Sequence, residues 1–146
     1  MSSITERGVE LIKSFEGFSP RMYCCAGGWL TVGYGHIVKH NEIAEFSNGI
    51  DGSTALKLLM QDIKVAERAV LALISVPLTE CQFDSLTSFT FNLGAGSLQR
   101  SSMRQQINRG EHENVPRELM KWVYAGGRKL KGLVLRRSAE GRLYSS

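Results

Sequence analysis

The chain has 146 residues, of which 42% are hydrophobic and 22% charged, so it is long enough for one domain with a substantial core. No apolar run approaches the roughly 18 residues that a transmembrane helix needs, so we expect no stable membrane insertion. The formal net charge is +4, and residues 100–146 hold 11 of the 18 Lys and Arg residues, which predicts an anionic partner such as nucleic acid, an anionic membrane or bacterial wall polymer.

The first elements are a helix and a group of short strands. Apolar residues recur at helical spacing over residues 4–16, and Pro20 ends that pattern. The same stretch has no basic segment followed by a long apolar core, so we expect no cleaved signal peptide. Residues 22–38 place aromatic and β-branched residues around glycines, which predicts two or three short strands with turns at Gly27–Gly28 and near Gly33–Gly35.

The rest of the chain is mainly helical in pattern. Residues 39–52 are polar and predict irregular structure, and a helix is expected from Ser53, which is a good N-cap. Pro77 ends this helix, and another is expected to begin at Thr79. The glycines within residues 92–97 predict a turn, with two or three further helices after it. This order of elements predicts an α+β fold with a small sheet early in the chain and a helical lobe after it.

The three cysteines include two neighbours, Cys24 and Cys25. Adjacent cysteines rarely bridge each other because the ring is strained, so we expect free thiols. The Cys and His residues do not have the spacing of a four-ligand zinc site, and no CxxC redox motif is present, so we expect no metal and no cofactor. A nucleophilic pair of Cys25 with His36 stays open, and Cys81 is expected to serve packing.

Four residues are candidates for a catalytic or structural role. Glu16 ends the first predicted helix beside two phenylalanines, and burial among aromatic rings favours the protonated form that a general acid requires. A surface glutamate at a helix end is the alternative. Thr31 suits an ordinary strand position. His36 suits a structural hydrogen bond, and Asp62 is either its partner or a solvated helix residue.

Taken with their spacing, these residues resemble the phage-type lysozymes, the endolysins of glycoside hydrolase family 24. That family has a helix ending in Glu-Gly, an Asp or in some members a Cys nine residues later, and a Thr six further within T-[IV]-G-Y-G-H. Here the series is Glu16-Gly17, Cys25, and TVGYGH starting at Thr31. The likeness continues through PLTECQFDSLTSFTFNLGAG at 77–96 and KWVYAGGRKLKGLVLRRSAE at 121–140.

The resemblance implies one lysozyme-like domain over residues 1–146. It would have a small β lobe at about 14–52, a helical lobe at about 1–13 and 53–146, and an active-site cleft between them. The implied activity is a glycoside hydrolase, a muramidase that cleaves the β-1,4 bond between N-acetylmuramic acid and N-acetylglucosamine in peptidoglycan and so lyses a bacterial host.

The resemblance also implies roles for individual residues. Glu16 matches the general acid, and Thr31 matches the threonine that positions the attacking water. His36 and Asp62 match a structural pair that links the sheet to the long helix. The positions that line the sugar-binding cleft match Gly35, Ile37 and Phe91.

Cys25 stands where most members of the family have a carboxylate. A glycosidase uses that group as base or nucleophile. An unperturbed thiol has a pKa of about 8.5, against about 3.9 for aspartate, so a thiolate at neutral pH needs help from its neighbours. Three roles for Cys25 stay open: accepting a proton from water, stabilising positive charge on the sugar, or attacking the sugar directly.

The resemblance makes peptidoglycan the expected partner and nucleic acid an unexpected one, because no nucleic-acid-binding motif supports the positive charge. We expect a monomer, and the lack of a signal segment or membrane anchor predicts accumulation in the host cytoplasm; the resemblance implies that a separate holin opens the membrane. Two alternatives stay open. A lytic transglycosylase would cut the same bond and leave a 1,6-anhydro sugar, and a wall-binding protein that lost catalysis at Cys25 would bind peptidoglycan without cutting it.

Overall fold

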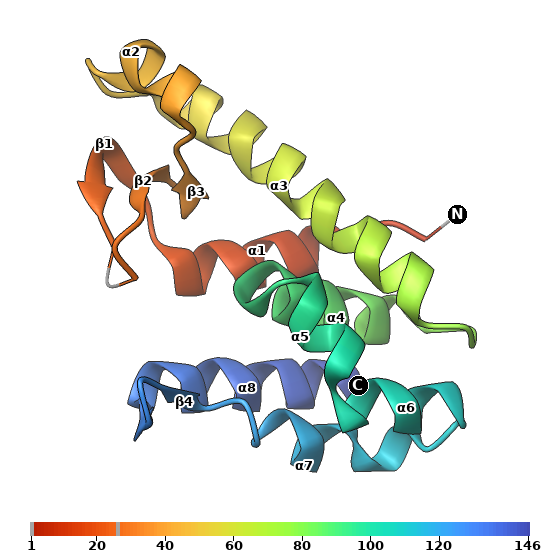
Figure 1. Ribbon diagram of the computed structural model, residues 1–146. Coiled ribbons are helices and arrows are strands. Elements are labelled where there is room, and N and C mark those ends of the chain that lie inside the picture. The colour runs from red at the N-terminus through yellow and green to blue at the C-terminus, as the bar shows by residue number, and fades with distance from the viewer. Residues whose placement is uncertain (1, 26) are drawn as a thin grey trace. The chain divides into compact units, whose positions relative to one another are not determined.

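The computed structural model describes residues 2–25 and 27–146, which form two compact units. One unit is Ile12–Lys64 and carries a three-stranded sheet; the other contains the chain up to Leu11 together with Val65–Ser146 and is mainly helical (Figure 1). The predicted α+β composition is confirmed. Within the described residues, no helix combines the length and the apolar character that crossing a membrane would require.

The Ile12–Lys64 unit contains an antiparallel sheet of β1 (Ser19–Cys24), β2 (Leu30–Gly33) and β3 (His36–Ile37), in that order. The prediction of two or three short strands is confirmed. One face of the sheet covers a small apolar core that includes Val32 and Phe46. Thr31, the neighbour of Val32 in β2, points to the other face.

The prediction that residues 39–52 are irregular is wrong in part. A 3-10 turn, η1 (His40–Glu42), and a short helix, α2 (Ile43–Phe46), lie there. The Glu42 carboxylate accepts the Lys39 backbone N–H at 2.8 Å, and Phe46 is buried in the small core. Tertiary packing of one aromatic residue therefore decides the local structure of a segment whose composition favours a loop.

Two long helices confirm the patterns seen in the sequence. α1 (Glu6–Glu16) and α3 (Gly52–Leu73) occupy the segments predicted as helices, and the boundaries between the two units fall inside both. Gly17 follows α1 with φ +71°, the left-handed conformation that commonly ends a helix. Glu16 is therefore fixed as the last residue of α1.

The mainly helical unit is organised around α4 (Glu80–Leu93), which packs against α8 (Lys131–Tyr144). α4 begins as predicted: the Thr79 side chain accepts the Gln82 backbone N–H, and the Gln82 side chain accepts the Thr79 N–H in return. The core of this unit consists of apolar side chains from most of its helices, among them Phe83, Leu86, Phe89, Leu98, Met103, Ile107, Val115 and Leu119.

The chain after residue 93 has more elements than predicted. Of the turn predicted within residues 92–97, only Gly94 lies outside a helix, because α4 ends at Leu93 and α5 (Ala95–Arg100) starts directly after Gly94. Then follow α6 (Ser102–Asn108), η2 (His112–Asn114), α7 (Val115–Leu119) and a hairpin of β4 (Tyr124–Ala125) and β5 (Arg128–Lys129). Helices of five to seven residues are too short to show a periodic pattern.

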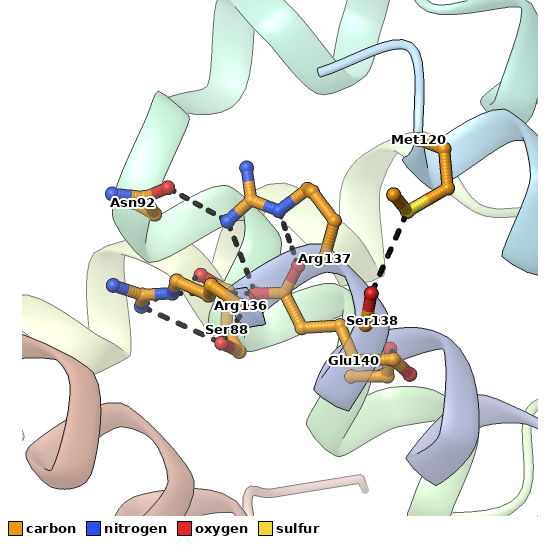
Figure 2. Close-up of polar contacts among 8 residues, drawn as sticks. Ser88, Asn92, Met120, Arg136, Arg137, Ser138 and Glu140 are labelled. Carbon is orange, nitrogen blue, oxygen red and sulfur yellow. Dashed lines mark hydrogen bonds and ion pairs between the residues drawn. The ribbon is translucent and has the colours of Figure 1, made fainter. Parts of the chain in front are cut away.

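A cluster of buried charges joins α8 to α4 (Figure 2). Nε of Arg137 lies 2.7 Å from Oε1 of Glu140, and Nε of Arg136 lies 3.4 Å from its Oε2; all three side chains are almost fully buried. The Ser88 hydroxyl of α4 donates to the same Oε2 at 2.6 Å, and Asn92 accepts a hydrogen bond from Arg137 at 2.7 Å. Together with the Ser85 hydroxyl, which donates to the Glu140 carbonyl at 2.7 Å, this polar cluster connects α8 to α4.

Candidate active site

Glu16 is half-buried, and its carboxylate lies against the turn between β2 and β3. Gly35 in that turn has φ +76°, and a Cβ built on it would lie 2.6 Å from Oε1 of Glu16. Tyr34 in the same turn packs against Phe18, with ring centroids 5.4 Å apart, and Nζ of Lys13 lies 5.4 Å from the centre of the Tyr34 ring. These contacts hold the turn beside the end of α1. A larger residue at position 35 would displace the Glu16 carboxylate and would be strained at this positive φ.

Cys25 follows β1 and faces Trp29 across the hairpin that connects β1 to β2. The Cys25 backbone N–H donates to the Trp29 carbonyl at 2.9 Å, and the Gly28 N–H donates to the Cys25 carbonyl at 2.9 Å. Thr31 is buried in β2 and donates its hydroxyl to the same Trp29 carbonyl at 2.9 Å. The Trp29 carbonyl therefore accepts hydrogen bonds from both Cys25 and Thr31, two residues predicted to be catalytic.

Hydrogen-bond donors around the sulfur lower the pKa of Cys25 below that of an ordinary thiol. The Trp29 backbone N–H contributes most, followed by the Thr31 hydroxyl and the Gly27 N–H, and together they outweigh the opposing effect of burial. Donors of this kind stabilise the charged form, and the thiolate is the reactive form of cysteine. The hairpin thus favours an anion at Cys25.

The other cysteines have different surroundings. Cys24 is exposed at the end of β1, where it pairs with Leu30. Cys81 is half-buried in α4, and its sulfur lies 3.3 Å from Nη1 of Arg7. It was expected to serve packing alone, but it also makes this polar contact. All three cysteines are free thiols, as predicted.

His36 is buried at the start of β3 and bridges two carboxylates. Its Nδ1 lies 2.8 Å from Oδ2 of Asp62 in α3, and its Nε2 lies 3.2 Å from Oε1 of Glu42. The hydrogen bond to Asp62 is the main cause that raises the pKa of His36; burial opposes it, and Glu42 adds to it. Both ring nitrogens have carboxylate partners, so the alternative of a Cys25–His36 nucleophilic pair has no support.

This cluster predicts that thermal stability depends on pH. Because the pKa of His36 is raised in the folded protein, its stabilising effect is complete below the unfolded value of about 6.5 and is lost as pH rises through the folded pKa. Burial raises the pKa of Glu42, but the Lys39 backbone N–H and His36 together lower it by more than burial raises it. The contribution of Glu42 to stability is therefore lost as pH falls through this lowered pKa, below about 4.5.

Thermal unfolding followed by circular dichroism should therefore show a Tm that is highest between about pH 5 and pH 6.5 and declines toward pH 8. Asp62→Asn should flatten that alkaline decline, because it removes the main partner of His36. The matched control is His40→Gln, which alters an exposed histidine and should leave the profile unchanged. An alkaline decline that persists in Asp62→Asn would contradict this assignment.

The remaining predicted residues are divided between the two units. Ile37 is 52% exposed in β3, next to His36. Phe91 is half-buried in α4 of the mainly helical unit. The Ile12–Lys64 unit therefore carries all the other predicted site residues, namely Glu16, Cys25, Thr31, Gly35, His36, Ile37 and Asp62.

Sequence reasoning missed three features of the site. Glu42 was hidden in a segment predicted as irregular. Tyr34 lies within the TVGYGH motif, but its packing on Phe18 has no signal in the sequence. The Trp29 carbonyl and N–H are backbone groups that every non-proline residue carries, so only the hairpin register reveals their role.

Comparison with known proteins assigns the family. Residues 13–140 match the family model described as phage lysozyme. The chain is 35% identical over 147 residues to the endolysin of Acyrthosiphon pisum secondary endosymbiont phage 1, and the match covers 98% of each. It is also 35% identical over 144 residues to the endolysin of Bacillus phage B103, which covers 97% of this chain but only 54% of that relative, about half its length.

Among solved structures, the muramidase domain of SpmX from Asticaccaulis excentricus superimposes with a TM-score of 0.88 at 30% identity. The superposition covers 100% of this chain and 99% of that one. The family match extends over both compact units, and it includes the Glu16, Cys25 and Thr31 positions. The chain belongs to the phage lysozyme family.

Proposed function

We propose that the chain is a muramidase endolysin, which hydrolyses the β-1,4 bond between N-acetylmuramic acid and N-acetylglucosamine in peptidoglycan. Glu16 is the general acid, and the Cys25 thiolate replaces the second carboxylate that glycosidases of this kind use. The observation that carries the proposal is the set of donors around the Cys25 sulfur. They lower the pKa of Cys25 and so shift it toward the thiolate, the charge state that the second catalytic group needs.

The mechanism follows from what each side chain can supply. Glu16 donates its proton to the glycosidic oxygen as the bond breaks, and positive charge develops on the sugar ring. The Cys25 thiolate stabilises that charge. The Thr31 hydroxyl donates its one hydrogen bond within the hairpin, to the Trp29 carbonyl or to the Cys25 sulfur, and its lone pairs are left to accept a hydrogen bond from the attacking water.

The stereochemistry of the product distinguishes two forms of this mechanism. Direct attack by the Cys25 sulfur forms a covalent glycosyl-enzyme, which water hydrolyses with the Glu16 carboxylate as base, and yields retention. Attack by a water held at Thr31, which passes its proton to the Cys25 thiolate, yields inversion. Proton NMR of the anomeric signal during hydrolysis of soluble glycan strands reports which anomer appears first.

The proposal extends to partners and access. The excess of Lys and Arg in residues 100–146 favours association with an anionic cell wall. We propose that the protein acts as a monomer, and that it reaches the wall from the host cytoplasm after a separate holin has opened the membrane. The resemblance to endolysins is what supports these statements.

The test combines lysis with analysis of the products. Purified protein added to permeabilised bacteria should lower the turbidity, and mass spectrometry of the released fragments should find reducing N-acetylmuramic acid ends. Fragments lighter by one water, with 1,6-anhydro ends, would identify a lytic transglycosylase. Binding to isolated walls without release of fragments would identify a protein that has lost catalysis.

Gly35→Ala should lower the lytic rate by about a hundredfold, because the new Cβ would lie 2.6 Å from the Glu16 carboxylate and must displace it. The matched control is Gly127→Ala. Gly127 also has φ +76°, but nothing lies within 4 Å of its added Cβ, so it pays the same backbone strain without touching the site. Turbidity assays and melting curves on both variants separate the two effects. Equal lytic rates for both variants would show that Gly35 does not position Glu16.

A further inference from the structure

The indole of Trp29 has no role in the mechanism above, although its backbone does. Trp29 is 61% exposed on the hairpin that carries Cys25 and Thr31. Large aromatic side chains bury much apolar area when they make a contact, and an indole also offers one N–H donor. An exposed indole beside a reactive group is therefore suited to contact a ligand.

Strand register places Trp29 on the same face as the two catalytic candidates. Tyr23 pairs with Thr31 and Cys24 with Leu30, and the hydrogen bond from the Cys25 N–H to the Trp29 carbonyl extends this pairing by one residue. Successive residues of a strand point to opposite faces, so positions 25, 29 and 31 share one face. Leu30 packs against the small core instead, on the opposite face.

The Trp29 indole and the Cys25 thiol both lie beside Gly27. A Cβ built on Gly27 would lie 3.2 Å from Cδ1 and 3.7 Å from Nε1 of Trp29, and 3.8 Å from the Cys25 sulfur. The five-membered ring of the indole and the sulfur therefore border the same point of the turn. A glycine at this position leaves that space open between them.

We propose that the Trp29 indole is a sugar-binding platform, which packs against the apolar C–H face of the glycan ring bound beside Cys25. The inference rests on the proposed function and adds a substrate-positioning residue to that site. A 4-linked N-acetylhexosamine with equatorial substituents presents its axial C–H bonds as a flat apolar face, which matches an aromatic ring in shape and polarity. The indole N–H is left to bond a hydroxyl or acetamido oxygen.

Steady-state kinetics on soluble, uncross-linked glycan strands test the platform. Trp29→Ala should raise KM by roughly tenfold and leave kcat within about twofold, and Trp29→Tyr should recover most of the loss. Tyr124→Ala is the matched control, because Tyr124 is 60% exposed on the β4–β5 hairpin and should leave both constants unchanged. A wild-type KM in Trp29→Ala would overturn the proposal.

The alkylation rate of Cys25 tests whether the indole acts through the thiol. The groups of Trp29 that lower the pKa of Cys25 belong to the backbone and persist in Trp29→Ala, so iodoacetamide should react with Cys25 at the wild-type rate. A changed rate, or a loss of kcat that Trp29→Tyr does not restore, would overturn the platform and assign the side chain to the thiol instead.

A binding measurement keeps this inference separate from the proposed activity. In a Glu16→Gln background, glycan strands should shield Trp29 from acrylamide quenching. Trp122, which is half-buried against Phe89, provides the residual fluorescence that a Trp29→Phe variant isolates. Hydrolysis by the wild type without any shielding would reject only the platform. Shielding in the Glu16→Gln variant, combined with no release of sugar fragments by the wild type, would reject only the activity.

Discussion

Glu16→Gln should lower the rate of wall lysis by about 10²- to 10⁴-fold, the range that general acid catalysis contributes. Glutamine has nearly the same shape as glutamic acid, but its amide does not protonate a leaving oxygen. The variant should keep its melting temperature, because the side chain still fits against Gly35 without a Cβ in its way. The loss is therefore expected in kcat, with little change in binding to isolated walls.

The matched control for this prediction is Glu6→Gln, which removes an exposed carboxylate from the first turn of the same helix. It should lyse cells at close to the wild-type rate. The measurement is the initial slope of turbidity loss for both variants at equal protein concentration. Near-normal lysis by Glu16→Gln would remove Glu16 from the mechanism, whatever the result for Glu6→Gln.

Glu140→Ala should lower the free energy of unfolding by about 3–5 kcal/mol, the cost of breaking a buried ion pair by removing one partner. Burial raises the pKa of Glu140, and the guanidinium groups of Arg137 and Arg136 oppose that by lowering it. Alanine removes this carboxylate from two buried arginines and from the Ser88 hydroxyl (Figure 2). The contact between α4 and α8 loses its central acceptor.

Urea denaturation at neutral pH measures this loss. Glu111→Ala is the matched control, because Glu111 also pairs with an arginine, Arg109, at 3.0 Å, but both side chains are substantially exposed. An exposed pair contributes about 0–1 kcal/mol, so this variant should differ little from wild type. If Glu140→Ala also lost less than about 1 kcal/mol, the buried cluster would not be what holds α8 to α4.

Local signals in the sequence were sufficient for the elements around the site. The helix that ends at Glu16 is followed by a glycine with positive φ, and glycines separate the three strands as expected. Thr79 and Gln82 form the capping box that starts α4. Each of these features depends on residues within a few positions of one another, which is the range over which sequence patterns act.

Features that depend on distant residues were not predictable in this way. In RRSAEG, Arg136, Arg137 and Glu140 have the spacing of a solvated, ion-paired helix surface, yet all three are buried against α4. Glu42 lies at the end of the 3-10 turn η1 and contacts His36, six residues earlier in the chain. The β4–β5 hairpin is different, because its Gly126–Gly127 pair is a local turn signal that the sequence does carry.

The candidate site shows the same division. Spacing and the family resemblance nominated Cys25 and Thr31, but the donors that favour a thiolate at Cys25 are mostly backbone N–H groups of Trp29 and Gly27. Backbone groups have no sequence signature, since nearly every residue carries them. Only the hairpin conformation aims them at the sulfur.

The role of Cys25 is tested most directly by lysis rates before and after treatment with iodoacetamide in Cys24→Ser, Cys25→Ser and Cys25→Asp. We expect Cys24→Ser to lyse cells and to be inactivated by the reagent, because its catalytic thiol remains. Cys25→Ser should be inactive, since a hydroxyl does not ionise near neutral pH, and Cys25→Asp should be active and resistant to the reagent. Lysis by Cys25→Ser at the wild-type rate, or loss of lysis in Cys24→Ser alone, would contradict the assignment of the second catalytic group to Cys25.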